Sequence, residues 1–310
     1  MIDNCVLCPR QCGVDRDAGQ TGFCGETSQL RIAFAGIHRG EEPPLTGDGG
    51  SGTIFVTGCN LGCAFCQNYQ VSQKGAGRAV TSDEFADICL ALQEKGVENI
   101  NIVTGSHAAP AIAFGLEAAR KSGLAIPVLW NSSGYDGMES LEILSDAIDV
   151  YLPDLKTLDA GIAARFFGTS DYPVHAKNAI LKMMEYRKLK FNSKKNDAMV
   201  SGVMVRHLVL PGHLDSTREV LAWFSENCRG RALLSLMTQY TPVGTSADMP
   251  DRFVSSEEYE KVLLMLDEFG IEEGFCQELV TGSDWLPDFR KINPFSSELS
   301  VPVWHHSRLT

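Results

Sequence analysis

Short apolar segments alternate with helical patterns along the chain from residue 53 onward. Six of these segments have the length of β-strands and are rich in β-branched or aliphatic residues. They span residues 53–57, 100–104, 126–130, 148–152, 202–210 and 232–237. Their apolar positions are continuous rather than alternating, which is typical of parallel strands covered on both faces. A seventh segment, 274–280, is a further candidate strand.

Capping sequences mark where several of the intervening helices begin. Thr81 to Glu84 and Ser255 to Glu258 each place a hydroxyl residue three positions before a glutamate, the pattern of a capping box. The same pattern at Ser216 to Glu219 predicts a third helix, and Asp136 predicts the start of a shorter one. A longer helix is predicted at 174–190, where the basic end suits a helix C-terminus.

Six consecutive strand–helix units predict a parallel α/β fold. A closed TIM barrel needs eight strands, so an open, partial (β/α)6 TIM-like barrel is the preferred architecture. A doubly wound sheet is the alternative, because the order of the units along the chain does not determine their order in the sheet. We divide the chain into a cysteine-rich N-terminal extension (1–50), a barrel (51–283) and a C-terminal strap (284–310) that packs on the barrel.

The charge balance limits the partners that the protein can have. The 310 residues include 27 basic and 39 acidic side chains, a formal net charge of −12. This excess of negative charge argues against nucleic acid or an anionic membrane as the main partner. No apolar run approaches the length of a membrane span, and residues 1–25 are polar and cysteine-rich rather than a signal peptide. We therefore expect a cytoplasmic protein.

Ten cysteines are many for a cytoplasmic protein, and their clustering matters more than their number. Seven of them precede residue 67. Clustered cysteines in a reducing compartment predict metal ligands rather than disulfides. Cys89, Cys228 and Cys276 are scattered, and we expect each of them to be a small core residue.

Cys59, Cys63 and Cys66 form a C-x3-C-x2-C loop directly after the first predicted strand. Three thiolates so close together suit a soft metal or an iron–sulfur cluster. A [4Fe–4S] cluster has four irons, so three cysteines leave one iron open to a small molecule. Our hypothesis is that this open iron binds and reduces S-adenosylmethionine. The alternative is a structural zinc loop whose fourth ligand lies elsewhere, although structural zinc prefers four protein ligands.

A second set of cysteines lies in a segment that is rich in Gly, Asp and Arg and has no helical or strand period. The set consists of Cys5, Cys8, Cys12 and Cys24. Such a segment has little core of its own, so a bound metal would have to organise it. Two interpretations stay open, a second iron–sulfur cluster that relays electrons and a structural zinc. A segment without metal is the third.

Polar residues follow each predicted strand, and in parallel α/β folds ligands bind at the carboxyl ends of the strands. Besides the cysteine loop, the polar and small residues at these ends are Thr104, Gly105, Ser106, His107, Asn131, Ser132, Ser133, Asp154, Lys156, Arg206 and Gln239. In the predicted fold all of them face one cavity. Any single one could instead be a helix cap or a turn residue, but their register with the cysteine loop favours a shared site.

The chemistry of this set suits a zwitterionic ligand that carries a nucleoside. The serines after the third strand can hydrogen-bond an amino or carboxylate group. Asp154 can accept from an ammonium group or hold a monovalent cation. Lys156 or Arg206 can pair with a carboxylate. Gln239 can bond a ribose hydroxyl.

At these residues the chain resembles the radical S-adenosylmethionine superfamily. The C-x3-C-x2-C motif with Phe65 just before its last cysteine is common in that family, and the resemblance covers about residues 50–285. Within the superfamily the chain is most similar to the pyruvate formate-lyase activating enzyme group. It looks most like relatives that carry a Cys-Val-Leu-Cys-Pro-Arg-Gln-Cys start and a Gly-Cys-Asn-Leu-x-Cys-x-Phe-Cys-Gln-Asn block.

The resemblance implies that the three loop cysteines hold a [4Fe–4S] cluster. It also places Thr104, Gly105 and Ser106 where the family usually has Gly-Gly-Glu, which meets the amino group of S-adenosylmethionine. The glutamate is absent from this chain, and His107 is a candidate to substitute for it.

The resemblance extends to the later strand ends. Residues 131–133 match a segment that in activating enzymes begins with Asp and contributes to the cofactor and to a monovalent cation. Asp154 and Lys156 match an Asp-x-Lys sequence near the methionine carboxylate. Arg206 lies on the matching strand, and Gln239 sits where those enzymes use a ribose-binding residue.

For activity, the resemblance implies that a reduced cluster donates one electron to S-adenosylmethionine. This yields methionine and a 5′-deoxyadenosyl radical that abstracts hydrogen from a substrate. Iron–sulfur potentials reach about −700 mV, low enough for this reduction. The implied partners are a low-potential reductant such as flavodoxin or ferredoxin and, as for activating enzymes, a glycyl-radical protein.

A peptide or small-molecule substrate is equally compatible with the sequence. Two readings from other classes also stay open. One is a ferredoxin-like iron–sulfur electron carrier, which would leave the polar strand ends unexplained. The other is a zinc-organised binding protein.

Overall fold

The computed structural model describes residues 2–194, 197–243, 249–283 and 285–307. Seven parallel strands form the body of its sheet. They are β2 (Ser51–Val56), β4 (Ile100–Val103), β5 (Val128–Ser132), β6 (Val150–Pro153), β8 (Ala198–Leu208), β9 (Leu233–Met237) and β10 (Gly274–Cys276). All six predicted strands are present, and the seventh candidate is a short strand that pairs with β9.

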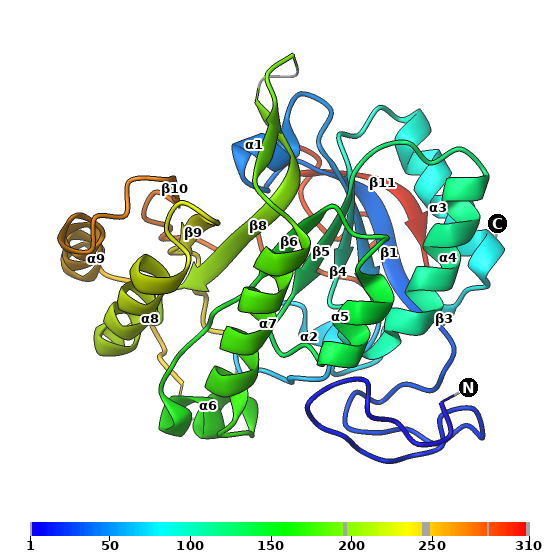
Figure 1. The fold of residues 1–310 in the computed structure, drawn as a ribbon, viewed down its shortest axis with the longest axis horizontal. Helices are drawn as coiled ribbons and strands as arrows, with labels where there is room; N and C mark the ends of the chain where they lie inside the picture. Colours follow the sequence, from blue (N-terminus) through cyan, green and yellow to red (C-terminus); the bar gives the residue numbers. More distant parts are fainter. Residues whose placement is uncertain (1, 195–196, 244–248, 284, 308–310) are drawn as a thin grey trace.

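The parallel strands lie side by side in the order in which they follow one another along the chain (Figure 1). A doubly wound sheet reverses its order part-way across, so that alternative is wrong. In the part of the chain described above, the sheet ends at β10 on one side and does not close into a full barrel. The architecture is the expected open, partial TIM-like barrel.

Antiparallel strands that the sequence pattern does not predict extend the sheet beside β2. β1 (Arg31–His38) pairs with β2, and β11 (Ser300–His305) pairs with β1 at the edge. β1 lies within the predicted N-terminal extension, so the sheet crosses the boundary drawn at residue 50. β11 comes from the predicted strap, whose first residue, 284, lies outside the described residues. Two short strands, β3 (Arg78–Ala79) and β7 (Lys190–Asn192), pair with β1 and β8.

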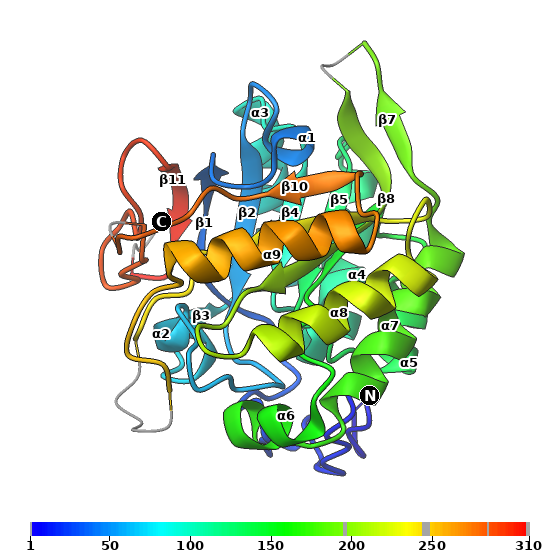
Figure 2. The same ribbon diagram turned by 90° about the vertical axis from the view of Figure 1, so that its left-hand side faces the viewer.

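Helices connect the parallel strands and cover the outer face of the sheet (Figure 2). The longer ones are α3 (Ser82–Glu94), α4 (Ala109–Lys121), α5 (Met138–Leu144), α6 (Ala160–Phe167), α7 (Tyr172–Tyr186), α8 (Leu214–Asn227) and α9 (Ser256–Glu268). The shortest are α1 (Pro43–Thr46), α2 (Tyr69–Ser72) and the 3₁₀ turn η1 (Ser106–Ala108). α1 and α2 lie at opposite ends of the sheet (Figures 1 and 2).

Two of the three predicted capping boxes are present. At Thr81 and Ser255 the hydroxyl accepts a hydrogen bond from the backbone N–H of the glutamate three residues on, and that glutamate bonds back to the cap. The third prediction is wrong. α8 begins at Leu214, and Ser216 lies inside the helix with its hydroxyl 2.7 Å from the Thr157 hydroxyl.

The other two helix predictions are partly right. α5 exists, but its cap is Gly137, and Asp136 is fully buried rather than capping the helix. α7 exists as well and ends at Tyr186, so the basic residues Arg187, Lys188 and Lys190 lie beyond the helix instead of in its last turn. Both errors come from contacts with distant parts of the chain that local spacing does not reveal.

The main core lies between the sheet and the helices, and Trp130 and Tyr151 are among its largest fully buried side chains. Cys89 and Cys228 are fully buried in it, as predicted. Cys276 is exposed at the end of β10, so the core prediction is wrong for that residue. None of the helices in the described ranges has the length and apolarity that crossing a membrane requires.

A separate aromatic cluster lies under the C-terminal segment, which runs from β10 to β11. Phe289 and Phe295 pack against Phe34 of β1 and Phe55 of β2, with ring centroids 5.0 to 6.2 Å apart. Gln70 of α2 accepts a hydrogen bond of 2.6 Å from the backbone N–H of Phe289. The C-terminal segment is therefore packed against the inner strands.

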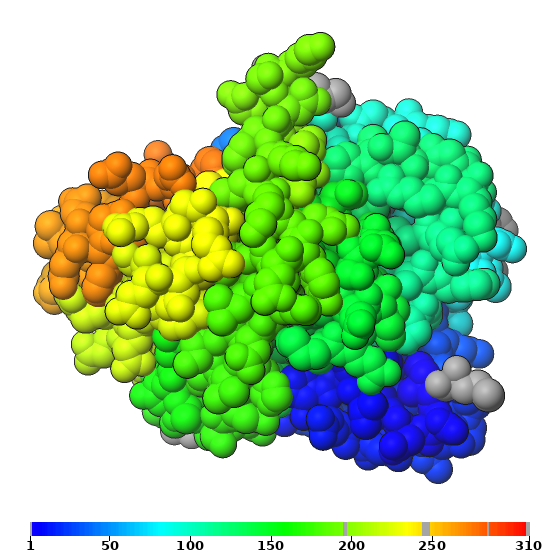
Figure 3. Space-filling model, in the orientation of Figure 1, coloured from blue at the N-terminus to red at the C-terminus, as the bar shows by residue number. Residues whose placement is uncertain are grey.

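The N-terminal segment has no helix or strand among residues 2–30 and docks on one end of the barrel (Figure 3). Arg10 anchors it. The Arg10 guanidinium donates to the carbonyls of Asn60 and Leu61 in the cysteine loop, and to two carbonyls at the end of α6, at 2.8 to 3.2 Å. It also stacks on Phe23 at 3.7 Å. These contacts join the extension directly to the cysteine loop.

Candidate active site

The cysteine loop and the inner face of the sheet enclose a cavity of about 790 Å³. Twelve of the predicted site residues line it. They are Cys59, Cys63, Phe65, Cys66, Thr104, Asn131, Ser132, Ser133, Asp154, Lys156, Arg206 and Gln239. The loop after β2 and the ends of β4, β5, β6, β8 and β9 therefore share one cavity, as parallel strands in barrel order require.

The backbone and nearby donors shape the cysteine loop. Gly58 precedes the first cysteine with φ +86°, a left-handed conformation that favours glycine. The backbone N–H of Leu61 points at Cys59 Sγ at 3.3 Å. The Ser72 hydroxyl lies 3.2 Å from Cys66 Sγ. Two of the three sulfurs thus have a polar neighbour within the loop or in α2.

Phe65 holds the loop against the barrel. Its ring packs edge-on to Phe166 and Phe167 of α6 and to Tyr240 after β9, with centroids 5.9 to 6.2 Å apart. The backbone N–H of Ala64 donates to the Phe166 carbonyl at 2.9 Å. The aromatic residue before the last cysteine therefore positions the loop through packing.

The loop thiols are buried and near enough to influence one another. Burial is the largest cause that raises the pKa of Cys63 far above its usual range and the pKa of Cys66 to about 11, and the interaction of each thiol with Cys59 acts in the same direction. The Lys156 ammonium acts in the opposite direction on both. At neutral pH the Cys63 and Cys66 thiols hold their protons unless a metal displaces them.

The arrangement of these thiols fits a cluster better than a single zinc ion. Across the described ranges, no three His, Cys, Asp or Glu side chains converge as ligands of one metal ion. A zinc ion needs four converging ligands. A [4Fe–4S] cluster does not, because each cysteine binds a different iron.

Thr104 follows β4 in a left-handed conformation (φ +61°), which is unusual for a β-branched residue. Its backbone N–H donates to the Asn131 carbonyl at 2.8 Å, which ties the ends of β4 and β5 together at the cavity. Gly105 packs beside Trp130, where a Cβ would lie 2.6 Å from the indole ring. Only glycine fits that position without moving the ring.

Ser106 and His107 are buried and lie outside the cavity lining. The His107 Nε2 donates to the Thr57 carbonyl at 2.7 Å, and burial lowers the pKa of His107 to about 4. The neutral imidazole therefore contacts the strand that leads into the cysteine loop and does not face the cavity.

Asp136 organises the ends of β4 and β5, a role that the sequence pattern does not predict. Its carboxylate accepts from the Ser106 hydroxyl at 2.6 Å, the Ser132 hydroxyl at 2.5 Å and Trp130 Nε1 at 3.2 Å. Burial raises the pKa of Asp136, and these three hydrogen bonds oppose that shift. The Ser132 hydroxyl is thereby held in place at the cavity edge.

Asp154 and Lys156 face the cavity as an ion pair of 2.5 Å, with side chains 19% and 14% exposed. Burial would lower the pKa of Lys156, but the charge of Asp154 and its hydrogen bond outweigh burial and raise that pKa above its usual range. The Tyr172 hydroxyl accepts from the Lys156 backbone N–H at 3.0 Å and lies 2.9 Å from the Asp154 carbonyl. The sequence has no local signal for this tyrosine, which begins α7.

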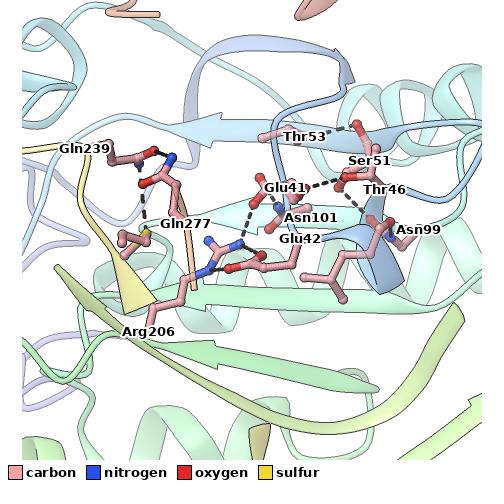
Figure 4. A network of polar contacts seen from close by, with 12 residues as sticks. Glu41, Glu42, Thr46, Ser51, Thr53, Asn99, Asn101, Arg206, Gln239 and Gln277 are labelled. Carbon is pink, nitrogen blue, oxygen red and sulfur yellow. Dashed lines mark hydrogen bonds and ion pairs between the residues drawn. The ribbon is translucent and has the colours of Figure 1, made fainter. Parts of the chain in front are cut away.

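Arg206 reaches two glutamates that the sequence analysis does not single out. Its guanidinium donates to both Glu41 and Glu42, and Nε lies 2.9 Å from Glu42 Oε1 (Figure 4). The three side chains are about nine-tenths buried. Arg206 therefore already has two carboxylate partners.

Gln239 links three parts of the cavity wall. Its carbonyl accepts from Gln67 Nε2, in the cysteine loop, at 2.9 Å. Its side-chain Oε1 accepts from Gln277 Nε2, just after β10, at 2.9 Å (Figure 4). The end of β9 is thereby joined to the loop on one side and to β10 on the other.

The four N-terminal cysteines lie outside this cavity and against the back of the cysteine loop. Burial raises the pKa of Cys8 to about 11, with contributions from Cys24 and Cys12, and a hydrogen bond from the Asn60 side chain opposes the shift. Cys24 also interacts with Cys5. Cys8 thus interacts with Cys12 and Cys24, Cys24 interacts with Cys5, and Asn60, which directly follows the first loop cysteine, contacts Cys8.

A buried arginine accompanies these thiols. The Arg16 guanidinium is 2% exposed, donates to the carbonyls of His107 and Thr27, and lies 3.9 Å from Cys5 Sγ. Its Nε has no hydrogen-bond partner among the described residues. Burial raises the pKa of Cys24, and the charge of Arg16 opposes that shift without outweighing it.

The chain matches proteins of one family. The model described as "Radical SAM superfamily" matches residues 53–224. The chain is also 30% identical over 284 residues to the uncharacterized protein MJ0674 of Methanocaldococcus jannaschii, a match that covers 88% of this chain and 77% of that protein.

Two solved structures share the fold. Streptococcus suis SuiB bound to the precursor peptide SuiA has a TM-score of 0.52 and 16% identity, covering 71% of this chain and 46% of SuiB. SuiB bound to S-adenosylmethionine has a TM-score of 0.52 and 15% identity, covering 74% and 49%. The chain thus spans about half the length of SuiB, and at this identity the likeness shows the fold alone.

A three-cysteine loop at the carboxyl end of an open parallel barrel defines a class of iron–sulfur enzyme. The chain belongs to the radical SAM superfamily, and that family implies a [4Fe–4S] cluster and S-adenosylmethionine.

Proposed function

We propose that this enzyme cleaves S-adenosylmethionine reductively at a [4Fe–4S] cluster held by Cys59, Cys63 and Cys66, and that hydrogen is abstracted from a substrate in the same cavity. The observation that carries the proposal is the shared cavity, which the three thiols line together with the polar strand ends. When bound, the cluster supplies the electron that divides S-adenosylmethionine into methionine and a 5′-deoxyadenosyl radical.

The polar strand ends bind and orient the methionyl part of S-adenosylmethionine. Lys156 pairs with its carboxylate, and Asp154 keeps Lys156 in place and accepts from the ammonium group. Thr104, at the strained end of β4, offers its backbone and hydroxyl to the same ammonium group. The rigid support from Tyr172 favours these roles, because a fixed ion pair loses little freedom when a ligand binds.

Other lining residues hold the remainder of the ligand. Ser132 and Ser133, with Asn131, contribute hydroxyl and amide groups after β5. Gln239 bonds a ribose hydroxyl. Gly105, Ser106 and His107 support the wall from behind, as their burial favours, and Phe65 positions the loop.

Release of 5′-deoxyadenosine tests this proposal. Anaerobic protein reconstituted with iron and sulfide, then given dithionite and S-adenosylmethionine, should form 5′-deoxyadenosine. Cys63→Ala should abolish both the product and most of the loop's iron. Cys276→Ala is the matched control for iron content, because Cys276 lines the cavity outside the loop. Parent levels of 5′-deoxyadenosine from Cys63→Ala would refute the assignment.

The covered side of the barrel favours a small-molecule substrate over a glycyl residue in a partner protein. An activating enzyme must admit a partner's glycine loop through an open mouth. Here Trp285, Pro287, Phe295 and Leu299 of the C-terminal segment line the cavity. Phe289, 1% exposed, anchors that segment.

We also propose that Cys5, Cys8, Cys12 and Cys24 bind metal. The proximity of these thiols to one another and to Arg16 supports the proposal. The two candidates are a second iron–sulfur cluster, in which each thiolate binds a different iron, and a zinc ion, for which the four thiols would have to converge more closely than they do in this structure. Metal analysis of a variant with all three loop cysteines changed to alanine distinguishes the two, because residual iron indicates a cluster and zinc indicates a structural site. Truncation at residue 50 is unsuitable, since it removes β1.

The reductant and the location follow from the same chemistry. A low-potential donor such as flavodoxin or ferredoxin supplies the electron, and the N-terminal extension, which contacts the cysteine loop, is the proposed side of approach. Ligand thiols must stay reduced to bind iron, which favours the cytoplasm. Stimulation of 5′-deoxyadenosine release by reduced flavodoxin in place of dithionite tests the choice of donor.

A further inference from the structure

Charged side chains form the end of the cavity opposite the cysteine loop. β1 is antiparallel to β2, so the loop that carries Glu41 and Glu42 enters where β2 begins, whereas the cysteine loop follows where β2 ends. A six-residue strand separates those ends by roughly 17 Å. We call Glu41, Glu42 and Arg206, with the adjoining His38 and Asn101, the acidic floor (Figure 4 shows all but His38).

The acidic floor carries an excess of negative charge. Among the residues that the structure describes, the cavity lining holds the carboxylates of Glu41, Glu42 and Asp154 and two permanent cations, Lys156 and Arg206. Asp154 and Lys156 neutralise each other. Burial would raise the pKa of Glu42, but the charge and hydrogen bonds of Arg206 lower it, so this carboxylate stays ionised at neutral pH. One guanidinium therefore faces two carboxylates.

The floor also contains buried polar atoms without partners. Asn101 is fully buried and donates from Nδ2 to Glu41 Oε1 at 2.8 Å, while its Oδ1 accepts no hydrogen bond from any described residue. His38 lines the cavity, and its Nδ1 likewise has no partner in the described part of the chain. Burial lowers the pKa of His38, so the ring adds no positive charge to balance the floor. Asn101 contacts Glu41 but is not among the residues that line the cavity, whereas His38 and Glu41 both line it. The unpartnered His38 Nδ1 and the Glu41 carboxylate together favour a ligand that donates N–H groups.

The C-terminal segment covers one side of the cavity. The side chain of Gln70 accepts a hydrogen bond from the backbone N–H of Phe289. The rings of Phe289 and Phe295 pack on Phe55 of β2. The volume of about 790 Å³ lies within the range of about 300–1,000 Å³ usual for small-ligand pockets. S-adenosylmethionine at the cysteine end leaves the floor for a second, small molecule.

We propose that the substrate of this enzyme is a small organic cation, with a primary ammonium or guanidinium group that binds the acidic floor at Glu41. The inference rests on the proposed function for the reaction at the cysteine end. The cation donates N–H groups to Glu41, which lines the cavity, and the rest of the molecule extends along the cavity toward the cysteines. Arg206 donates to both glutamates and holds them in place, and its charge lowers the pKa of Glu42.

Binding of simple probes tests this proposal without turnover. Reconstituted full-length protein, saturated with S-adenosylmethionine and without reductant, is titrated with n-butylammonium, 1-butanol and butyrate. The cation should bind about tenfold more tightly than the alcohol, the difference expected for one charge-assisted hydrogen bond, and butyrate should bind least. Equal binding of cation and alcohol, or tighter binding of butyrate, overturns the proposal.

Charge-neutral variants locate the effect. Glu41→Gln should remove most of the tenfold preference, because the floor then has no excess charge. Glu94→Gln, the same substitution at an exposed position on α3, should leave the preference unchanged. An unchanged preference in Glu41→Gln overturns the proposal. If Glu41→Gln does not fold, the comparison of the three probes on the parent protein still decides.

The experiment separates this inference from the proposed function. Displacement of n-butylammonium by S-adenosylmethionine would assign the floor to the cofactor and overturn the inference alone. Normal 5′-deoxyadenosine release without any cation preference would do the same. Cation binding in a protein that never cleaves S-adenosylmethionine would refute the proposed function and leave the acidic floor as a binding site.

Discussion

Lys156 Nζ lies 2.5 Å from Asp154 Oδ2, and the two side chains meet at the carboxyl end of β6, inside the cavity. The exposed surface of α4 carries a second lysine–carboxylate pair that is not buried. Lys121 and Glu117 of α4 are 2.6 Å apart, with side chains 73% and 60% exposed. The two pairs differ in their access to water, which decides how much each contributes to stability.

Loss of Lys156 should therefore destabilise the protein. Lys156→Met leaves the largely buried Asp154 carboxylate without its partner and should lower the free energy of unfolding by about 3 kcal/mol. Lys121→Met should change it by less than about 0.5 kcal/mol. Urea unfolding of both variants under anaerobic conditions checks the difference. Adding Asp154→Asn to Lys156→Met should recover part of the loss, and similar effects of the two lysine variants would contradict this account.

Gly58 should tolerate no side chain. A Cβ there would lie 2.5 Å from Glu26 and 2.8 Å from the Cys24 carbonyl, in addition to the strain of φ +86°. Gly58→Ala should cost about 1–2 kcal/mol for the left-handed backbone and about 1–3 kcal/mol more for overpacking against the N-terminal segment.

Gly96→Ala is the matched control for that substitution. Gly96 has φ +81°, but nothing lies within 4 Å of the added carbon, so only the backbone term applies. Thermal unfolding measures the stability that each variant loses. The difference between the two losses is the cost of the contact between the added methyl group at position 58 and the N-terminal segment. Equal losses of stability in the two variants would mean that the N-terminal segment moves away from the new methyl group at no cost.

Acid should weaken the fold through His207. The ring is buried, Nδ1 lies 2.7 Å from the Leu155 carbonyl and Nε2 lies 3.0 Å from the Thr217 hydroxyl, and burial lowers the pKa of His207 to about 4. Between that value and the unfolded value near 6.5, the unfolded chain binds more protons, so stability falls as the pH is lowered through this window.

The size of this effect is measurable. His207 should account for about 2 kcal/mol of the stability lost between pH 7 and pH 5. His207→Gln removes the titrating group and should flatten the pH dependence over that interval, whatever its own stability at pH 7. Guanidinium unfolding at the two pH values gives the slopes. Parallel slopes for parent and variant would rule out His207 as the source.

Arg10 should control how firmly the extension holds the cysteine loop. Arg10→Lys keeps the charge but loses the planar contacts to four carbonyls and the stacking on Phe23. We expect stability to fall by about 2 kcal/mol and the cluster to bleach faster in air. Arg218→Lys, at an exposed pair with Glu268, should change neither. The decay of visible absorbance on exposure to air provides the second measurement.

Local patterns predicted the inner part of the molecule well. Continuous apolar segments mark strands covered on both faces, so all six predicted parallel strands were recovered. β1 was missed because its apolar run, Arg31–His38, lies beside the cysteine-rich segment and no pattern marks an antiparallel partner. β11 contains Pro302, which suits an edge strand and weakens the strand signal.

The residues of the site also fall into those that local patterns predict and those that only the fold brings together. The cysteine loop and the residues that directly end the strands could be read from spacing, because adjacent positions in the chain build them. Glu41 and Glu42 meet Arg206 across 164 to 165 residues, and Tyr172 supports Lys156 from another helix. No short-range pattern encodes such pairs, since they form only when the barrel brings distant segments together.

The sequence by itself determined the cluster-binding loop, the alternation of parallel strands with helices, and the family to which the chain belongs. All three depend on residues that are close together along the chain. The tertiary structure decided which strand-end residues face the cavity, that Ser106 and His107 turn behind its wall, and that an acidic floor lies opposite the cysteines. Burial and charge pairing between distant segments set those features, and neither exists until the chain has folded.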